Sequence, residues 1–144
     1  MVQLFEVSII YYHLIVLIFL HYDLLYTHKI VDIYILYIIG DTNSITIGDN
    51  VTVGDRAMIH VSGTTANKPT TIGNNVIIES GATIHGSTVE DNTYIGSGSQ
   101  ILDGALIKTN SYVGAGSVVA QGKVVPSGQL WAGKLSFLVC TSIY

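Results

Sequence analysis

The strongest constraint on the fold of this chain is an aliphatic residue that recurs at every sixth position over much of its length. The interval lengthens to thirteen residues after Ile59 and shortens to five after Ile84. The full series is Ile47, Val53, Ile59, Ile72, Ile78, Ile84, Val89, Ile95, Ile101, Ile107, Val113, Val119 and Val125. A period of six fits neither an amphipathic helix nor a simple alternating strand. It predicts a short strand followed by a turn, three of which close a triangular coil of about eighteen residues.

The residue two positions before the aliphatic one is in most cases small or β-branched, as at Val51, Ala57 and Ser99. We expect both residues to point into a narrow interior, where only a compact neighbour can share the space. Successive coils then stack as parallel strands about 4.8 Å apart. Glycine often follows the aliphatic residue, as at Gly54, and we expect it to relieve a turn in which positive φ is common. The predicted fold is all-β, a parallel β-helix over residues 40–133.

The segments on either side of this repeat differ from it in composition. Residues 1–39 contain no glycine and long runs of Ile, Leu and Tyr, while residues 134–144 form a divergent tail. The longest clean apolar stretch, residues 9–20, is shorter than the roughly 18–20 residues of a membrane span. Few basic residues argue against a signal or transit peptide. Our hypothesis is that residues 1–39 are translated intron or a wrong exon join, the alternative being a hydrophobic anchor.

The charge and cysteine content exclude two classes of protein. Six Lys plus Arg stand against ten Asp plus Glu, for a net charge of −4, and Arg56 is the single arginine. No basic groove for nucleic acid is therefore expected. The lone Cys140 cannot form an internal disulfide, so the chain does not read as a small disulfide-stapled domain.

The long interval after Ile59 is interpreted as one turn of the repeat plus an excursion loop. Ile59 and Ile84 then lie on the same face of adjacent coils, and so do the residues that follow them, His60 and His85. Their Cβ atoms are expected to lie roughly 5 Å apart. Two imidazoles at this separation can share a zinc ion, although two histidines alone are an incomplete site; the other interpretation is a chance stack of two outward histidines.

Two runs of sequence resemble a known family. They are "KPTTIGNNVIIESGATIHGSTVEDNTYIGSGSQILDGALI" and "VGAGSVVAQGKVVPSGQLWAG", within which "IHGSTVED" and "PSGQLWAG" are the most specific parts. The chain resembles the γ-class carbonic anhydrases and their eukaryotic relatives from about Gly40 to Gly133. The resemblance implies a left-handed β-helix, a homotrimer or heterotrimer with γ-carbonic-anhydrase paralogues, and a Zn²⁺ ion between subunits. His60 and His85 match the two ligands that one subunit supplies.

The third ligand is where the sequence departs from this family. Glu79 and Ser80 stand where the family has Gly-His, and a neutral hydroxyl is a poor zinc ligand, so low occupancy is expected unless Glu79 or a water replaces the third ligand. Asp41 and Asp55 match the family's two aspartates, which implies that Asp41 positions a subunit contact or the substrate and that Asp55 orients the site or assists proton transfer. Both aspartates are equally read as ordinary turn residues.

Three functions follow from these observations. The first is metal-dependent hydration of CO₂, which the loss of the third histidine puts in doubt. The second is a non-catalytic subunit of a γ-carbonic-anhydrase trimer, which in eukaryotic relatives belongs to mitochondrial respiratory complex I. The third is an acyltransferase, because many acyltransferases share this β-helix. The family resemblance implies a mitochondrial location, with the cytoplasm as the alternative.

Overall fold

The computed structural model describes residues 15–20, 24–26, 30–31, 35–40, 43–62, 68–134 and 137–140, with side chains for residues 43–62 and 68–134. Every described element is a β-strand, and all but the last pair of strands run parallel in three sheets. The first sheet contains β1 (Ile15–Leu20), β4 (Ile35–Gly40), β7 (Ala57–His60), β10 (Thr83–His85), β13 (Gln100–Ile101) and β16 (Val118–Val119).

The other two sheets complete a triangular prism. The second contains β2 (Leu24–Tyr26), β5 (Ile45–Ile47), β8 (Thr70–Ile72), β11 (Thr88–Val89), β14 (Leu106–Ile107) and β17 (Val124–Val125). The third contains β3 (Ile30–Val31), β6 (Val51–Val53), β9 (Ile77–Ile78), β12 (Tyr94–Ile95), β15 (Tyr112–Val113), β18 (Leu130–Ala132) and the antiparallel β19 (Phe137–Cys140). Up to β18, consecutive strands thus fall in different sheets, and each strand from β4 to β18 pairs with the strand three elements before it.

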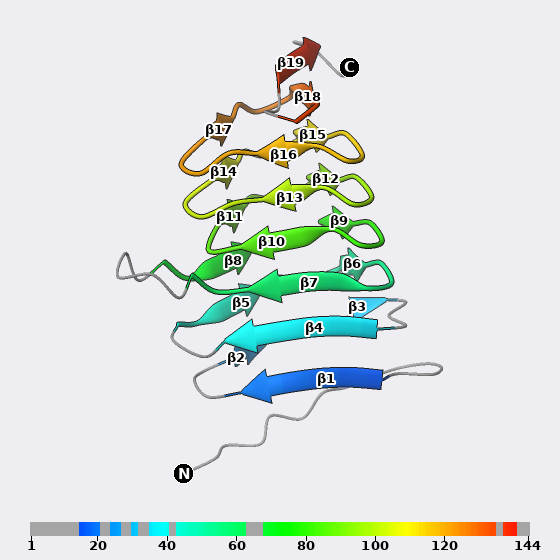
Figure 1. Ribbon diagram of the computed structural model, residues 1–144, viewed down its shortest axis with the longest axis vertical. Coiled ribbons are helices and arrows are strands. Elements are labelled where there is room, and N and C mark those ends of the chain that lie inside the picture. Colours follow the sequence, from blue (N-terminus) through cyan, green and yellow to red (C-terminus); the bar gives the residue numbers. More distant parts are fainter. Residues whose placement is uncertain are drawn as a thin grey trace.

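The coil is left-handed. In Figure 1 the chain runs along β7 at the front, passes behind through β8 and β9, and returns to the front one level higher at β10. Parallel crossover connections are almost always right-handed, so this fold is an exception to the usual rule. The predicted all-β, left-handed parallel β-helix is confirmed.

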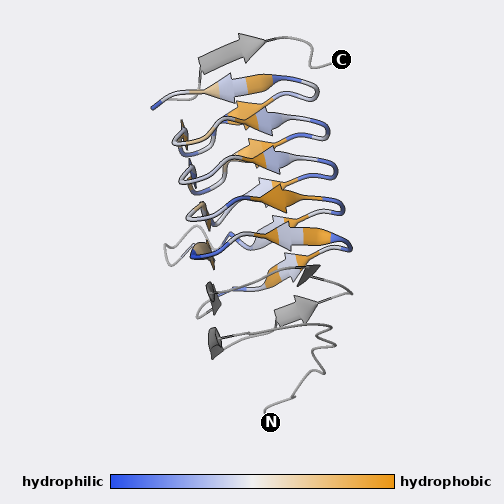
Figure 2. Ribbon diagram, turned by 90° about the vertical axis from the view of Figure 1, so that its right-hand side faces the viewer, coloured by the Kyte–Doolittle hydropathy of each residue, from blue (hydrophilic) through white to orange (hydrophobic). Residues whose placement is uncertain are grey.

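The interior is a single column of the predicted aliphatic residues. Each of the thirteen, from Ile47 to Val125, is at most 1% exposed, and the small residues two positions earlier are also buried. Figure 2 shows the result from outside, with hydrophobic colour on the strands and hydrophilic colour at most of the corners. The hydroxyls of Thr93, Ser99 and Ser111 in this column donate to the carbonyl three residues earlier, as Ser99 Oγ does to the Gly96 oxygen at 2.6 Å.

The five glycines after an aliphatic residue have a different role from the one expected. None of them has positive φ; at the corners that conformation is adopted by other glycines and by asparagines such as Asn75 and Asn92. A Cβ on Gly54 would lie 2.4 Å from the Ser80 nitrogen of the next coil. Glycine is needed there because the coils approach too closely for a side chain, and the expectation of a relieved turn was wrong.

Strands β1 to β4 continue the three sheets below Gly40. β4 pairs with β7 from Leu36↔Ala57 to Ile39↔His60, while β2 pairs with β5 and β3 with β6. This pairing does not bear on how the segment arose, so the wrong exon join in residues 1–39 stays a prediction, as does the divergent origin of residues 134–144. Within the described residues no helix is long and apolar enough to cross a membrane.

Adjacent residues of β9 offer a direct test of the inward face. Ile78 is 1% exposed and Ile77 is 41% exposed, although the two have the same side chain. Ile78→Ala should lower the free energy of unfolding by about 2–5 kcal/mol, because it leaves a cavity in a close-packed column. Ile77→Ala should cost less than about 1 kcal/mol. Denaturant unfolding of both variants measures the difference; equal losses would contradict the assignment of the inner face.

Candidate functional site: a histidine and aspartate column at one corner

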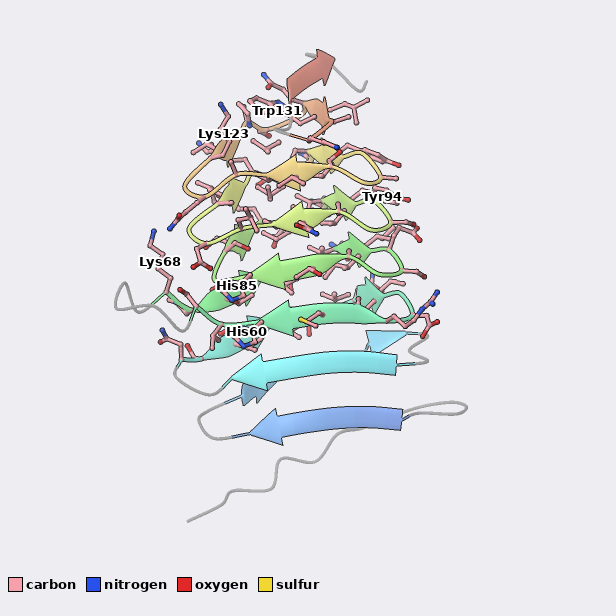
Figure 3. All side chains as sticks on the ribbon, viewed as in Figure 1. His60, Lys68, His85, Tyr94, Lys123 and Trp131 are labelled. Atoms are coloured by element: carbon pink, nitrogen blue, oxygen red, sulfur yellow. The ribbon has the colours of Figure 1, made fainter. Side chains whose placement is uncertain are left out.

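Two imidazoles stack where β7 and β10 end. His60 pairs with His85 in the strand register, one residue beyond the Ile59–Ile84 pair. The ring centroids lie 4.7 Å apart and the planes differ by 3°. Figure 3 shows the two rings one above the other on the same edge of the prism. The predicted stack is therefore confirmed, and so is the interpretation of the long interval as one turn of the repeat plus a loop, since β7 is followed directly by β8 of the next sheet.

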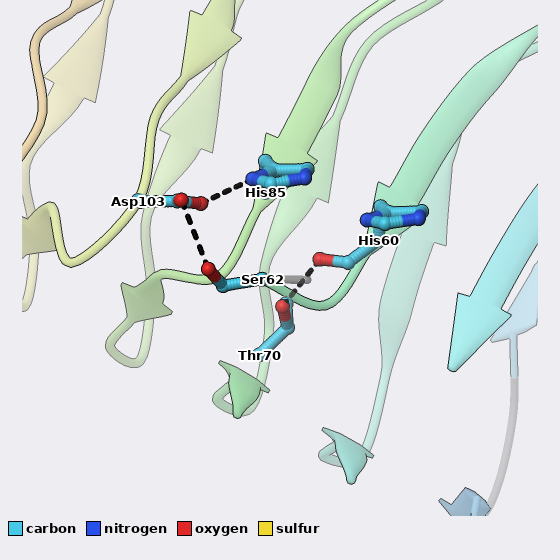
Figure 4. A network of polar contacts seen from close by, with 5 residues as sticks. All are labelled: His60, Ser62, Thr70, His85 and Asp103. Atoms are coloured by element: carbon cyan, nitrogen blue, oxygen red, sulfur yellow. Dashed lines mark hydrogen bonds and ion pairs between the residues drawn. The ribbon is translucent and has the colours of Figure 1, made fainter. Parts of the chain in front are cut away.

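A carboxylate completes this column from the next coil. Asp103 lies one residue beyond the position opposite His85 on the next coil, since Ile84 pairs with Ile101, and its Oδ1 contacts His85 Nδ1. Its second oxygen, Oδ2, accepts a hydrogen bond of 2.9 Å from Ser62 Oγ. These contacts are drawn in Figure 4. The aliphatic series places Leu102, not Asp103, opposite His85, because the five-residue step after Ile84 makes this coil seventeen residues long. The repeat therefore gave no signal for Asp103, and Ser62 had none either, since it lies in the interval where the repeat is interrupted.

The aspartate determines which nitrogen of His85 is reactive. A carboxylate at Nδ1 favours the tautomer in which Nδ1 carries the proton, so that Nε2 holds the lone pair. The side chain of His85 is 33% exposed and that of Asp103 is 15% exposed. The imidazole is therefore oriented by a half-buried partner on one side and can accept a proton or bind a metal on the other.

Gly86 makes room for this contact. Its φ is +48°, and a Cβ built on it would lie 2.7 Å from Asp103 Oδ1 and 2.7 Å from the Ser62 Cβ. The repeat shortens to a five-residue step at this corner, and the next residue, Ser87, is buried with its hydroxyl unpaired among the described residues. The local departure from the repeat thus coincides with the approach of Asp103 to His85.

His60 is held through its backbone. Its carbonyl oxygen accepts hydrogen bonds from Gly86 N at 3.0 Å and from Thr70 Oγ1 at 2.6 Å. Its ring Nδ1 is buried and has no hydrogen-bond partner among the described residues. The two histidines therefore differ, because only His85 has a carboxylate that fixes its tautomer.

The remaining predicted site residues lie elsewhere. Ser80 precedes β10, whereas His85 is the last residue of β10, so the strand separates them by roughly 10 Å. Asp55 lies near Ser80, since its carbonyl accepts a 2.8 Å hydrogen bond from Gly81 N. Its Oδ2 is 3.3 Å from Arg56 Nε, an exposed ion pair of little energetic weight. Asp41 lies outside the described residues.

Glu79 is engaged on the third sheet. Its Oε1 accepts a 3.0 Å hydrogen bond from the Tyr94 hydroxyl, and the Tyr94 ring stacks on Tyr112 with centroids 4.1 Å apart. Burial, followed by hydrogen bonds to Tyr112 and Glu79, raises the pKa of Tyr94 above its ordinary value. Glu79 is thus held away from the histidines of its own chain, and the expectation that it could replace the third ligand stays a prediction.

Among the described residues, the donor set at the histidines does not complete a zinc site. No group of three or more His, Cys, Asp or Glu side chains comes together in metal-binding positions in residues 43–62 and 68–134. Asp103 occupies Nδ1 of His85 rather than adding a third ligand beside the two imidazoles. Structural and catalytic zinc ions take at least three protein ligands, so the two histidines require a donor from beyond the residues whose side chains the structure describes.

These features define the chain as a left-handed β-helix of hexapeptide repeats that carries a His–Asp pair at one corner. Residues 44–85 match the family described as hexapeptide repeat of succinyl-transferase, and residues 86–121 match bacterial transferase hexapeptide (six repeats). The chain belongs to the hexapeptide-repeat superfamily of left-handed β-helix proteins. No curated protein sequence matches it.

Several solved structures are similar to the chain. A hexapeptide transferase family protein from Anaplasma phagocytophilum is 25% identical with a TM-score of 0.69, covering 81% of this chain and 78% of that one. A hexapeptide-repeat acetyltransferase from Vibrio cholerae, 23% identical with a TM-score of 0.62 over 78% and 70% of the two chains, shares the fold. A serine acetyltransferase in complex with CoA is 30% identical with a TM-score of 0.54, but the match covers 66% of this chain and only 39% of that one.

The space that Gly86 leaves for Asp103 can be tested against Gly122. Both glycines have positive φ at the same corner of the prism, but a Cβ on Gly122 would meet nothing within 4 Å. Alanine at either position should lower the free energy of unfolding by about 1 kcal/mol, because the left-handed conformation is unfavourable for a residue with a Cβ. Gly86→Ala should lose about 1–3 kcal/mol more, because its Cβ also displaces Asp103 or Ser62. Denaturant unfolding measures both losses, and similar values would contradict the close approach at Gly86.

Proposed function

We propose that this chain is an acyltransferase that moves an acyl group from a coenzyme A thioester to a hydroxyl or amine, with His85 as the general base. The observation that carries this proposal is the contact between His85 Nδ1 and Asp103 Oδ1. It leaves Nε2, on a part-exposed ring, as the nitrogen that accepts the proton of an acceptor group.

The chemistry needs only one such base. As His85 Nε2 removes the acceptor's proton, the acceptor oxygen or nitrogen attacks the thioester carbonyl and forms a tetrahedral intermediate. Its collapse breaks the carbon–sulfur bond, and the imidazolium returns the proton to the departing thiolate. Asp103 is a positioning residue in this scheme, because it holds the Nδ1–H tautomer and stabilises the imidazolium that forms.

The similar structures support this chemistry. Two of them are described as acetyltransferases, and one of these is in complex with CoA. Because the match to serine acetyltransferase covers 39% of that chain, neither serine nor the acetyl group is carried over to this one. The acyl acceptor is defined here only as a group whose proton His85 can remove.

Removing the base should abolish the reaction. His85→Asn keeps a polar side chain of similar shape but cannot act as a base, and it should lower acetyl-CoA-dependent thiol release by at least about 100-fold. Asp103→Asn should lower kcat while acetyl-CoA still binds. Thiol release with pools of hydroxyl and amine acceptors measures the rate, and a thermal shift assay measures acetyl-CoA binding. The proposal would be overturned if His85→Asn released thiol as fast as the unaltered chain. It would also be overturned if the unaltered chain did not bind acetyl-CoA.

A second candidate, a γ-carbonic-anhydrase-like subunit, is favoured by the parallel stack of His60 on His85. It is supported by the resemblance of "IHGSTVED" and "PSGQLWAG". In this case the chain trimerises with copies or paralogues, and a neighbouring subunit supplies the third donor from the position of Ser80. Association with respiratory complex I and a mitochondrial location belong to this candidate and stay predictions, and so do the roles of Asp41 and Asp55.

The second candidate makes a distinct prediction for zinc. The unaltered chain should bind well below one zinc per subunit, because a hydroxyl at Ser80 is a poor ligand. Ser80→His should raise the zinc content towards one per subunit, provided that Ser80 of one copy faces the histidines of another. Elemental analysis of the purified oligomers measures both values. Stoichiometric zinc in the unaltered chain, or no gain in Ser80→His, would contradict it.

A further inference from the structure

We propose that Ser62 is a positioning residue that acts on His85 through Asp103. The inference rests on the proposed function for its effect on rate, but its effect on the imidazole can be observed without any reaction. It concerns a residue that lies outside the hexapeptide repeat.

Ser62 stands at the start of the interrupted part of the repeat. It follows Val61 on the coil of His60, and it is 1% exposed. Its backbone nitrogen donates to the Lys68 carbonyl at 3.5 Å, which joins the two described ends of the interval from residue 62 to residue 68. A buried position and a backbone contact thus fix the residue from which the hydroxyl projects.

The hydroxyl of Ser62 meets the carboxylate that orients the base. Ser62 Oγ donates to Asp103 Oδ2 at 2.9 Å, while Asp103 Oδ1 contacts His85 Nδ1. An ionised carboxylate can only accept hydrogen bonds, so the serine is the donor and the aspartate is held at both oxygens. A carboxylate held at two points cannot rotate away from the ring, and hydrogen bonds to charged groups are among the stronger ones in proteins.

This arrangement links three successive coils. Ser62 comes from the coil of His60, His85 from the next and Asp103 from the one above, and Figure 4 shows the hydroxyl and the ring reaching the same carboxylate. Gly86 is the residue whose missing Cβ lets Ser62 and Asp103 meet beside His85. The interval after Ile59 therefore contributes to the site, because it contains Ser62, whose hydroxyl donates the hydrogen bond that fixes Asp103.

The chain provides a matched control in Ser87. It is as buried as Ser62, at 1% exposed, and lies at the same corner two residues after His85. Its hydroxyl has no hydrogen-bond partner among the described residues. Ser87→Ala and Ser62→Ala remove the same atom from equally buried positions, but only the second breaks the contact with Asp103.

The experiment compares Ser62→Ala, Ser87→Ala and Asp103→Asn in the full chain. In Ser62→Ala we expect kcat for acetyl-CoA-dependent thiol release to fall about tenfold with little change in KM, since the substrate contacts are intact. Nitrogen-15 NMR of the neutral imidazole should show a growing fraction of the Nε2–H tautomer of His85, as in Asp103→Asn. Ser87→Ala should match the unaltered chain in both measurements.

Two outcomes separate this inference from the proposed function. The positioning role of Ser62 is overturned if Ser62→Ala, like Ser87→Ala, leaves the tautomer ratio of His85 and the rate of thiol release unchanged. If His85→Asn retains activity, the acyltransferase proposal fails while the NMR comparison still decides the role of Ser62. Should Ser62→Ala fold poorly, Ser62→Cys keeps the size of the side chain with a much weaker donor. It should then give an intermediate shift in the tautomer ratio, and no shift would equally overturn the role.

Discussion

Every feature of this chain depends on the parallel hydrogen bonds that join each coil to the next. They require strands about 4.8 Å apart, and at that spacing the interior of a triangular coil holds one large aliphatic side chain per wall. The column from Ile47 to Val125 satisfies this limit with residues that are at most 1% exposed. Chemistry is thereby excluded from the interior and placed on the outer faces and corners. There each side chain has a neighbour directly above and below it.

This stacking turns spacing along the sequence into proximity in space. A coil of seventeen residues pairs Ile84 with Ile101 and brings Asp103 to His85, and a coil lengthened by the excursion brings His85 over His60. A functional group on a β-helix is therefore built as a column of single residues from successive coils. No segment of continuous sequence contains the site, and the excursion after β7 loops out without disturbing the pairing of Ile59 with Ile84 and of His60 with His85.

The sequence predicted the repeating part of the molecule well, because one physical rule generates it. The inward residues, the stacked histidines and the handedness implied by the family resemblance agree with the structure. The glycines after the aliphatic residues were misjudged, because their cause is the backbone of the neighbouring coil, as Ser80 is for Gly54. Asp103 was not predicted, because the five-residue step after Ile84 puts Leu102 opposite His85 in the repeat. Ser62 could not have been found, since within the interrupted interval the repeat assigns no residue to a position in the coil.

The same imidazole orientation suits both candidate chemistries, so the orientation of His85 alone does not distinguish them. A carboxylate at Nδ1 prepares Nε2 for a proton as well as for a metal ion. The two chemistries differ in the groups that they require besides this oriented imidazole. Acyl transfer needs one oriented base, and His85, Asp103 and Ser62 of a single chain provide it. A zinc ion needs a third donor, and Ser80 is separated from His85 by the length of β10. Among the described residues the column supplies an oriented base, and the matches to hexapeptide-repeat transferases and to a serine acetyltransferase in complex with CoA make acyl transfer the better supported proposal.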